Sequence, residues 1–254
     1  MEDLKLRGGE EEEDRKMEMI KKTDEKILFK AKMDESLANA IRRSVSLVPV
    51  MAIDEVEISR NDSAMYDETL AHRLGLVPLK FDKSFKEDNV LKFKIDSKKE
   101  GAVYSGDIKG DVEVAYDRIP ITLLNANQEL KLKGKTKMGT AKEHAKFSPG
   151  ILFYRNVSEI ILDKSFERDV LRIFPKTKIK EKGNKIAFKD EQEKGILDFC
   201  EGISQKNKKP IEVNETGELV FVVESFGQMK ADEIFKKAAE ALKKELKNVT
   251  KTIK

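Results

Sequence analysis

Two histidines are the side chains whose chemistry is easiest to name. Glu68 and His72 are four positions apart, so they would share one face of a helix. A zinc site combining His72, His144 and a nearby glutamate is conceivable, because imidazole and carboxylate groups bind zinc. An ordinary pair of neighbouring side chains explains Glu68 and His72 more simply. Nothing in the sequence places His72 near His144, so we expect no metal site.

Other catalytic signatures are missing from the sequence. Neither glycine-rich phosphate-binding pattern, G-x-x-x-x-G-K or G-x-G-x-x-G, occurs, and no serine or cysteine lies in a nucleophile motif. Asp54, Asp62, Asp67 and Glu68 do not form the D-x-D-x-D cluster that would hold magnesium. The single cysteine, Cys200, can form neither an internal disulfide nor a multi-thiolate site. We expect Cys200 to be a half-buried free thiol and the chain to have no catalytic residues of its own.

The charges are numerous but balanced. The 50 Lys and Arg residues face 47 Asp and Glu residues, for a net charge of +3, and tryptophan is absent. Lysines in 131–137 and 206–209 could contact phosphates, but no aromatic residue is interleaved with them for base stacking. The composition therefore disfavours a dedicated nucleic-acid-binding protein. No apolar run reaches the roughly 18–20 residues of a membrane span, and the N-terminus lacks signal-peptide features, so we expect a cytoplasmic protein.

The N-terminal part predicts an acidic tail, a hairpin and a helix. Residues 1–14 are too acidic to bury anything and predict a disordered tail. Strands at 17–20 and 27–31 form the expected hairpin, and a helix begins after Asp34 and ends at Pro49. Its two faces are an apolar one (Leu37, Ala40, Ile41, Ser44, Val45, Val48) and a polar one (Asn39, Arg42, Arg43, Ser46).

The C-terminal segment predicts a long amphipathic helix of roughly 20 residues. Its apolar residues recur at spacings of three and four: Phe235, Ala238, Leu242, Leu246, Val249 and Ile253. This stripe could pack on the chain's own sheet or on a helix of another chain. The pattern alone favours the chain's own sheet.

The middle of the chain predicts short strands and one separate lobe. A short helix is expected within 65–76, closed by Gly75. Residues 164–213 are basic and broken by Gly and Pro, which indicates a small lobe. The expected strands are 52–59, 90–95, 102–104, 112–115, 129–133, 151–155, 157–162, 186–188 and 219–224.

Several blocks resemble the α-like subunits of RNA polymerases, which include the D subunits of archaeal polymerases, the third-largest subunit of eukaryotic polymerase II and, more distantly, bacterial α. The helix block reads Leu-Ala-Asn-Ala-Ile-Arg-Arg from Leu37, and the next reads Tyr-Asp-Glu-Thr-Leu-Ala-His-Arg-Leu-Gly from Tyr66. Further blocks at 119–128 and 141–149 resemble the archaeal and eukaryotic branch specifically, and 223–227 extends the match almost to the C-terminus.

The resemblance implies an α+β fold and a non-catalytic role. The implied function is assembly of DNA-directed RNA polymerase, a nucleotidyltransferase complex, through a heterodimer with small subunit L that docks subunits N, P and the second-largest (B) subunit. The implied parts are a dimerisation domain (15–48, 149–163 and 214–254), an inserted, mostly β domain (49–148) and a ferredoxin-like lobe (164–213).

The resemblance also assigns interface residues. The implied dimer interface comprises Leu37, Ile41, Val45, Phe235, Ala238, Leu242, Leu246 and Val249. The residues implied to face other subunits are Asn39, Arg42, Arg43, Glu68, His72 and Arg73. Arginine suits such contacts because its planar fork pairs with carboxylates and carbonyls. Salt bridges within the chain are the alternative role for the polar set.

The chain departs from the family at its cofactor positions. Many archaeal relatives hold an iron–sulfur cluster in the lobe, but Phe174 stands where a cysteine would be and Cys200 is a lone remnant. We therefore expect neither a cluster nor zinc, because residues 80–92 lack cysteine as well. The expected lobe core is Val170, Ile173, Phe174, Ile186, Phe188, Ile196 and Phe199. The alternative function is a free-standing nucleic-acid-binding protein that uses this lysine-rich lobe.

Overall fold

The computed structural model describes residues 17–80 and 90–252, so the predicted tail at 1–14 lies outside the described residues. The described chain divides into two compact units, each built from segments far apart in the sequence. Unit 1 comprises residues up to Thr23, then Ile27–Asn39 and Leu152–Val222, and unit 2 comprises Asp24–Lys26, Ala40–Ile151 and the residues from Val223 onward. The domain boundaries predicted from the resemblance stay a prediction.

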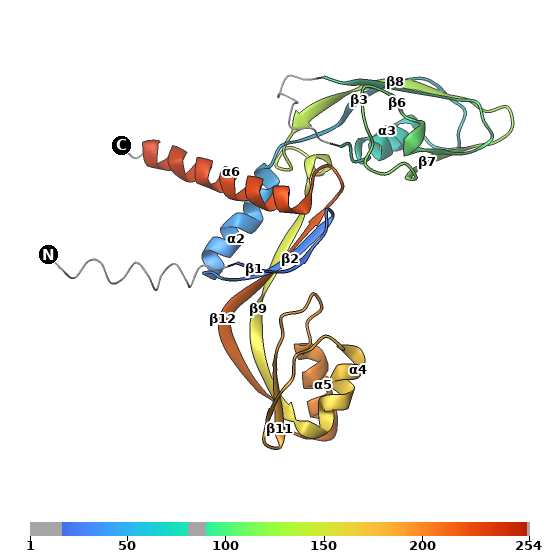
Figure 1. The fold of residues 1–254 in the computed structure, drawn as a ribbon. Coiled ribbons are helices and arrows are strands. Elements are labelled where there is room, and N and C mark those ends of the chain that lie inside the picture. Colours follow the sequence, from blue (N-terminus) through green and yellow to red (C-terminus); the bar gives the residue numbers. More distant parts are fainter. Residues whose placement is uncertain (1–16, 81–89, 253–254) are drawn as a thin grey trace. The chain divides into compact units, whose positions relative to one another are not determined.

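The main sheet, most of which lies in unit 1, has six strands among the described residues, in the order β1-β2-β12-β9-β11-β10 (Figure 1). These strands are β1 (Glu18–Lys22), β2 (Lys26–Lys32), β9 (Gly150–Asp163), β10 (Lys180–Lys182), β11 (Lys185–Lys189) and β12 (Glu212–Ser225). The predicted hairpin is present, because β1 and β2 pair antiparallel. The strands predicted at 151–155 and 157–162 are one continuous strand, β9, because no residue between them interrupts the backbone pairing.

The predicted first helix is shorter than expected. Helix α2 spans Glu35–Ser44 and is followed by a 3-10 turn, η1 (Val45–Leu47), rather than continuing to Pro49. Asp34 caps the start, since its Oδ1 accepts a hydrogen bond from the Ser36 backbone N–H at 2.8 Å. Within unit 2, η1 packs against helix α6 (Ala231–Thr252), whose 22 residues match the predicted C-terminal helix.

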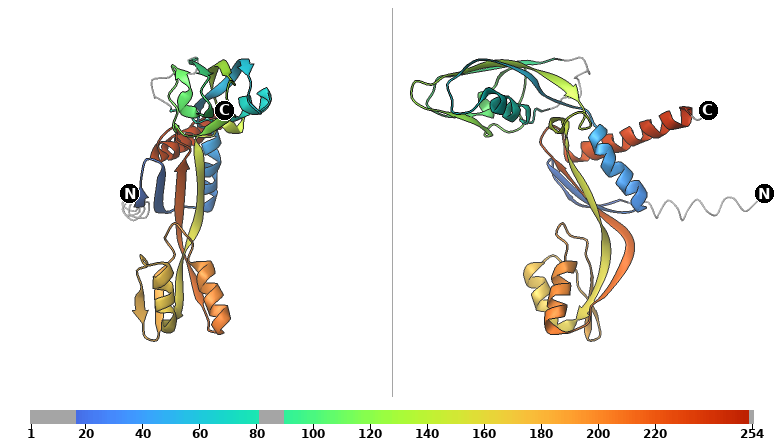
Figure 2. Two further views of the ribbon diagram at one scale, coloured as in Figure 1. Left: turned by 90° about the vertical axis from the view of Figure 1, so that its right-hand side faces the viewer. Right: turned by 180° about the vertical axis from the view of Figure 1, so that it is seen from behind.

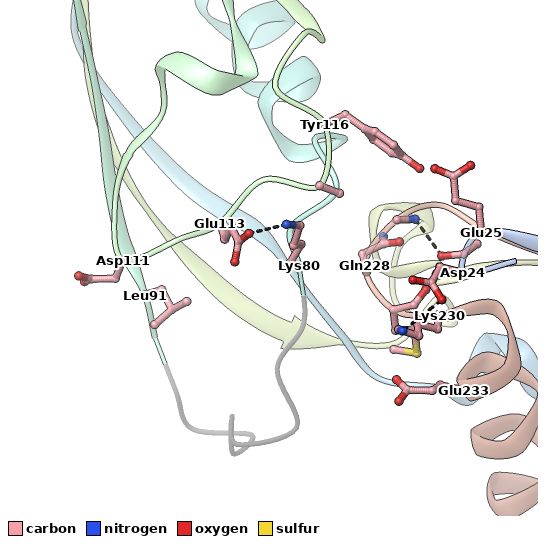
Figure 3. Close-up of a pocket in the computed structure, with 14 residues that line it drawn as sticks. Asp24, Glu25, Lys80, Leu91, Asp111, Glu113, Tyr116, Gln228, Lys230 and Glu233 are labelled. Carbon is pink, nitrogen blue, oxygen red and sulfur yellow. Dashed lines mark hydrogen bonds and ion pairs between the residues drawn. The ribbon is translucent and has the colours of Figure 1, made fainter.

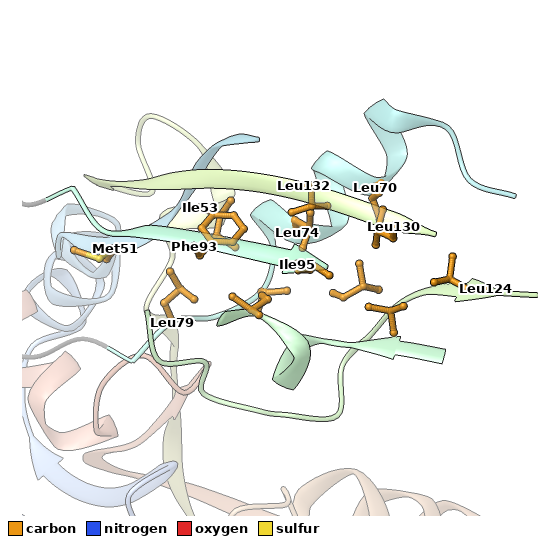
Figure 4. Packing of buried hydrophobic residues seen from close by; sticks show 14 residues of the cluster. Met51, Ile53, Leu70, Leu74, Leu79, Phe93, Ile95, Leu124, Leu130 and Leu132 are labelled. Carbon is orange, nitrogen blue, oxygen red and sulfur yellow. The ribbon is translucent and has the colours of Figure 1, made fainter. Parts of the chain in front are cut away.

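Unit 2 holds a second sheet with its own core. Its strands are β3 (Val50–Asn61), β8 (Leu130–Gly139), β4 (Lys92–Ser97) and β6 (Lys109–Gly110), in that spatial order, beside a pair formed by β5 (Gly101–Tyr104) and β7 (Pro120–Leu124). Helix α3 (Asp67–Gly75) inserts Leu70 and Leu74 against the sheet residues Ile53, Ile95 and Leu132 (Figure 4).

Two details of unit 2 differ from the prediction. The strand expected at 112–115 is only a single bridge between Leu79 and Val114, because the chain there runs as a loop beside Leu79. Gly75 ends α3 without a left-handed cap, because the cap residue is Leu76 in a right-handed conformation.

The lobe of unit 1 packs two helices on the sheet. Helices α4 (Glu167–Ile173) and α5 (Leu197–Asn207) lie against β9 and β11 (Figure 2). The lobe core contains Ile160, Leu162, Phe166, Val170, Ile186, Phe188, Ile196 and Cys200, with Phe174 and Phe199 partly buried beside it. Ile173 is 47% exposed, contrary to the prediction, because it is the last residue of α4 and no further turn covers it.

Candidate interaction surfaces

Burial divides the predicted apolar stripes of α2 and α6. Ile41, Val45 and Ala238 are buried inside the chain, and Phe235 and Leu242 are half-buried. By contrast, Leu37 on α2 is 45% exposed, and Leu246 and Val249 near the end of α6 are 58% and 56% exposed. The predicted apolar residues that stay exposed are therefore Leu37 on α2 and Leu246 and Val249 near the end of α6.

Strand β9 adds an exposed apolar surface that the sequence did not single out. Ile151 and Phe153 are 48% and 41% exposed, whereas Leu152 between them is buried. Because side chains alternate along a strand, Ile151 and Phe153 share one face. The sequence signal for this second apolar face is the unbroken apolar run at 151–154, which is typical of a strand covered on both faces.

The polar face of α2 is open. Arg42 and Arg43 are exposed, Asn39 is half-buried, and Ala38 and Ile41 lie on the buried side of the same helix. The arginines also occupy the last turn of α2, where a positive charge is favourable to the helix dipole.

Helix α3 presents part of the second predicted motif to solvent. Glu68 and His72 are exposed, while Arg73 is half-buried. The Arg73 guanidinium donates a hydrogen bond of 2.6 Å to the backbone carbonyl of Pro120, at the start of β7. Arg73 therefore holds α3 to β7, which is the intramolecular role that sequence reasoning left open.

His72 and His144 line one small cavity of about 140 Å³, although they come from distant segments. Beside them, Lys146 Nζ donates to Asp54 Oδ1 at 2.8 Å and to the Ile53 carbonyl at 3.1 Å. The hydrogen bond from Lys146 lowers the pKa of Asp54. Sequence reasoning found no connection between the histidines, because only the tertiary fold brings α3 and the segment before β9 together.

The cavity does not supply a metal site. Within residues 17–80 and 90–252, no three His, Cys, Asp or Glu side chains are grouped closely enough to hold a metal ion. The Lys146 ammonium forms an ion pair with the Asp54 carboxylate. His144 Nδ1 accepts a hydrogen bond from the Lys146 backbone N–H at 3.1 Å. The two imidazole groups therefore line the cavity beside a closed Lys146–Asp54 ion pair.

Cys200 is fully buried rather than half-buried, because α5 places it in the core of the lobe. Burial raises the pKa of the thiol to about 12, and the negative charges of Asp190 and Glu201 act in the same direction. A neutral thiol is a poor nucleophile and a poor metal ligand. Cys200 therefore serves as a small apolar core residue.

Comparison with known proteins gives one consistent answer. Residues 56–153 match the family described as the RNA polymerase Rpb3/RpoA insert domain. The DNA-directed RNA polymerase subunit Rpo3 of Archaeoglobus fulgidus is 31% identical, over 93% of this chain and 97% of its own length. The Rpo3 of Pyrococcus horikoshii is 32% identical over 89% and 93%, and that of Methanobrevibacter smithii is 29% identical over the same shares.

These similarities confirm the predicted relationship to the α-like polymerase subunits. They extend over most of the chain. Among the described helices, even α6 is too polar to cross a membrane. Identity above 30% over nearly the full length of both chains shows that this chain belongs to the Rpo3 family of DNA-directed RNA polymerase subunits.

Proposed function

We propose that this chain is a non-catalytic assembly subunit of an archaeal DNA-directed RNA polymerase and acts in the cytoplasm. The observation that carries the proposal is the 31% identity with the Archaeoglobus Rpo3 over 93% of the chain. Nucleotide transfer would then take place in other subunits. The role of this chain would be to present surfaces on which those subunits assemble.

The first such surface is apolar and would form a heterodimer with the small subunit L. Leu246 and Val249 are three residues apart on α6, so they share a face, and more than half of each is exposed. Leu37 and Phe153 are further exposed apolar side chains in unit 1. Covering a large aliphatic side chain stabilises an interface by about 1.5–3 kcal/mol, so Leu246 and Val249 on α6 are suitable contact residues by themselves.

The second surface is polar and would dock subunits N and P and the second-largest subunit. The exposed arginines Arg42 and Arg43 on α2, and Glu68 and His72 on α3, offer charged groups of both kinds. Arg73 would support this surface indirectly, through its hydrogen bond to the Pro120 carbonyl.

Co-expression with an archaeal subunit L tests the proposal. The two chains should co-elute as a complex, and Leu246→Glu combined with Val249→Glu should abolish it while leaving the circular dichroism spectrum unchanged. Leu123→Glu is the matched control, because Leu123 is also exposed, at 61%, but lies on β7. Elution of this chain only as a separate monomer, or an intact complex with the double variant, would contradict the proposal.

We further propose that the lobe holds neither an iron–sulfur cluster nor zinc. The chain has one cysteine, and that thiol is buried in an apolar core. Iron and zinc analysis of the purified protein should find neither metal in stoichiometric amount. A protein with one iron–sulfur cluster per chain would refute this part of the proposal.

The alternative of a free-standing nucleic-acid-binding protein receives less support. Several lysines of the lobe are paired with acidic residues of the same chain, such as Lys189 with Glu218 at 2.8 Å and Lys209 with Asp163 at 2.8 Å. Neutralised lysines contribute less to phosphate binding. Tight, salt-sensitive binding of DNA or RNA by the isolated chain would favour the alternative.

A further inference from the structure

A large open cavity in unit 2 has no role in the proposed assembly. Its volume is about 670 Å³, which is in the range of ligand-binding cavities (Figure 3). It is bounded by the turn between β1 and β2, the loop around residues 111–116, the turn that follows β12 and the first turn of α6. All of its lining residues belong to the same compact unit.

The lining is strongly acidic. Five carboxylates line the cavity, from Asp24, Glu25, Asp111, Glu113 and Glu233, against the two ammonium groups of Lys80 and Lys230. Both lysines are already paired with acidic residues of the lining. Lys80 contacts Glu113, and Lys230 Nζ lies 3.1 Å from Asp24 Oδ1. The described lining residues therefore carry a formal charge of −3, which favours cations.

Gln228 gives an independent indication of a ligand. Its side chain is 5% exposed and belongs to the lining, and its Nε2 donates a hydrogen bond of 3.0 Å to the Ser148 carbonyl. This bond fixes the orientation of the Gln228 amide, because a flipped amide would place its Oε1 next to the Ser148 carbonyl oxygen, and neither oxygen could donate. Its Oε1 is buried and has no partner among the described residues. A buried acceptor without a donor is energetically unfavourable.

The turn that carries Gln228 is held in place. The Phe226 backbone N–H donates to the Pro149 carbonyl at 3.0 Å, and Ser225 Oγ accepts from the Gly227 N–H at 2.9 Å. The orphaned acceptor thus lies on a fixed segment. Among the described residues, no hydrogen-bond donor satisfies it.

The arrangement favours an organic cation over a metal ion. In the part of the chain that the structure describes, no three acidic or histidine side chains come close enough to bind a metal. Carboxylates spread around a wide cavity instead suit a ligand with several separated N–H donors. A guanidinium group has five donors and also stacks on aromatic rings, and the Tyr116 ring in the lining is 40% exposed.

We infer that this cavity, formed around Gln228, Glu25 and Asp111, binds arginine side chains of a basic segment from another protein. The Gln228 oxygen accepts from a guanidinium, and the carboxylates neutralise its charge. The inference does not depend on dimer formation with subunit L, because it concerns a different surface of the chain and is tested on the chain alone.

Fluorescence anisotropy with a labelled glycine–arginine peptide tests the inference. The full-length chain should bind this peptide, and a peptide with citrulline in place of arginine should not bind, because citrulline keeps the shape and loses the charge. Glu25→Gln combined with Asp111→Asn should weaken binding about tenfold. Glu100→Gln combined with Asp198→Asn removes the same charge from exposed sites outside the cavity and should leave the affinity unchanged.

Three results would overturn the inference. The first is equal weakening by both double variants, which would indicate non-specific attraction. The second is equal affinity for the citrulline peptide. The third is binding of spermidine without binding of the arginine peptide, which would make a free polyamine the occupant. Gln228→Met should also weaken peptide binding severalfold. If that variant does not fold, the carboxylate variants still decide the question.

Discussion

Gly227 is a position where a single added carbon should have a large effect that can be estimated from the structure. It has a φ of +102°, a conformation that side chains other than glycine rarely adopt. A Cβ at this position would also lie 2.8 Å from Ala115 Cβ and 2.8 Å from the Tyr116 ring. Both neighbours belong to the loop that lines the large cavity. Gly227→Ala therefore combines backbone strain with a steric clash.

The two effects can be added for an estimate. The strained backbone contributes about 1 kcal/mol, and overpacking contributes about 1–3 kcal/mol. We expect Gly227→Ala to lower the free energy of unfolding by about 3 kcal/mol. Urea titration followed by circular dichroism measures this, with the slope against urea concentration unchanged.

Gly101 separates strain from clash. Its φ is +119°, it lies in the same unit, and a Cβ there would have nothing within 4 Å. Gly101→Ala should therefore lower stability by only about 1 kcal/mol. Gly202 has ordinary dihedrals within α5 and open space around it, so Gly202→Ala should stabilise the protein by about 1 kcal/mol. Equal effects of Gly227→Ala and Gly101→Ala would refute the predicted clash.

Three further predictions concern ionisable groups. Because Lys146 lowers the pKa of Asp54, their ion pair stabilises the protein above about pH 4, and this stabilisation is lost as the pH falls through the lowered pKa. Lys146→Met should therefore lower the free energy of unfolding by about 1 kcal/mol at neutral pH and leave it unchanged in acid. Urea unfolding at both pH values measures this difference. The Cys200 thiol, with a pKa of about 12, should not react with Ellman's reagent at about pH 8 until urea unfolds the protein, and rapid reaction of the folded chain would contradict its burial. Burial lowers the pKa of Lys30, but hydrogen bonds from its ammonium to carboxylates, first that of Glu191, outweigh burial and raise the pKa. These hydrogen bonds stabilise the folded protein below the ordinary lysine pKa, and their contribution is lost as the pH rises through the raised pKa. Lys30→Met should therefore lower the free energy of unfolding by about 3 kcal/mol at neutral pH, and a change below about 0.5 kcal/mol would show that the pairing is immaterial.

The elements with long, regular patterns could be predicted from the sequence. The spacing of Phe235, Ala238 and Leu242 is enough to identify α6, because a helix of six turns repeats its signal many times. The lobe core was predictable in part, since Val170, Ile186 and Phe188 are buried together. Helix α4 itself was missed, because seven residues carry too little periodicity to stand out.

The surfaces were harder to predict than the elements. Amphipathicity shows which side of a helix is apolar, but not whether the chain itself covers that side. Val45 is buried by the chain's own fold, whereas Leu246 is exposed. Each of the two has an apolar residue four positions before it and another three positions after it, so the sequence pattern does not distinguish them. The shared cavity of His72 and His144 depends on tertiary contacts between segments that are far apart in the sequence.

The interleaved segments of the sheet have a consequence for synthesis. Strand β12 lies next to β2 in the sheet, yet some 180 residues separate the end of β2 from the start of β12. At roughly 5–20 residues per second, the ribosome needs roughly 10–40 s to supply that neighbour. Until then the nascent hairpin exposes Leu28 and Phe29, which are buried in the finished protein. The nascent chain is therefore a candidate client for chaperones that shield emerging apolar strands.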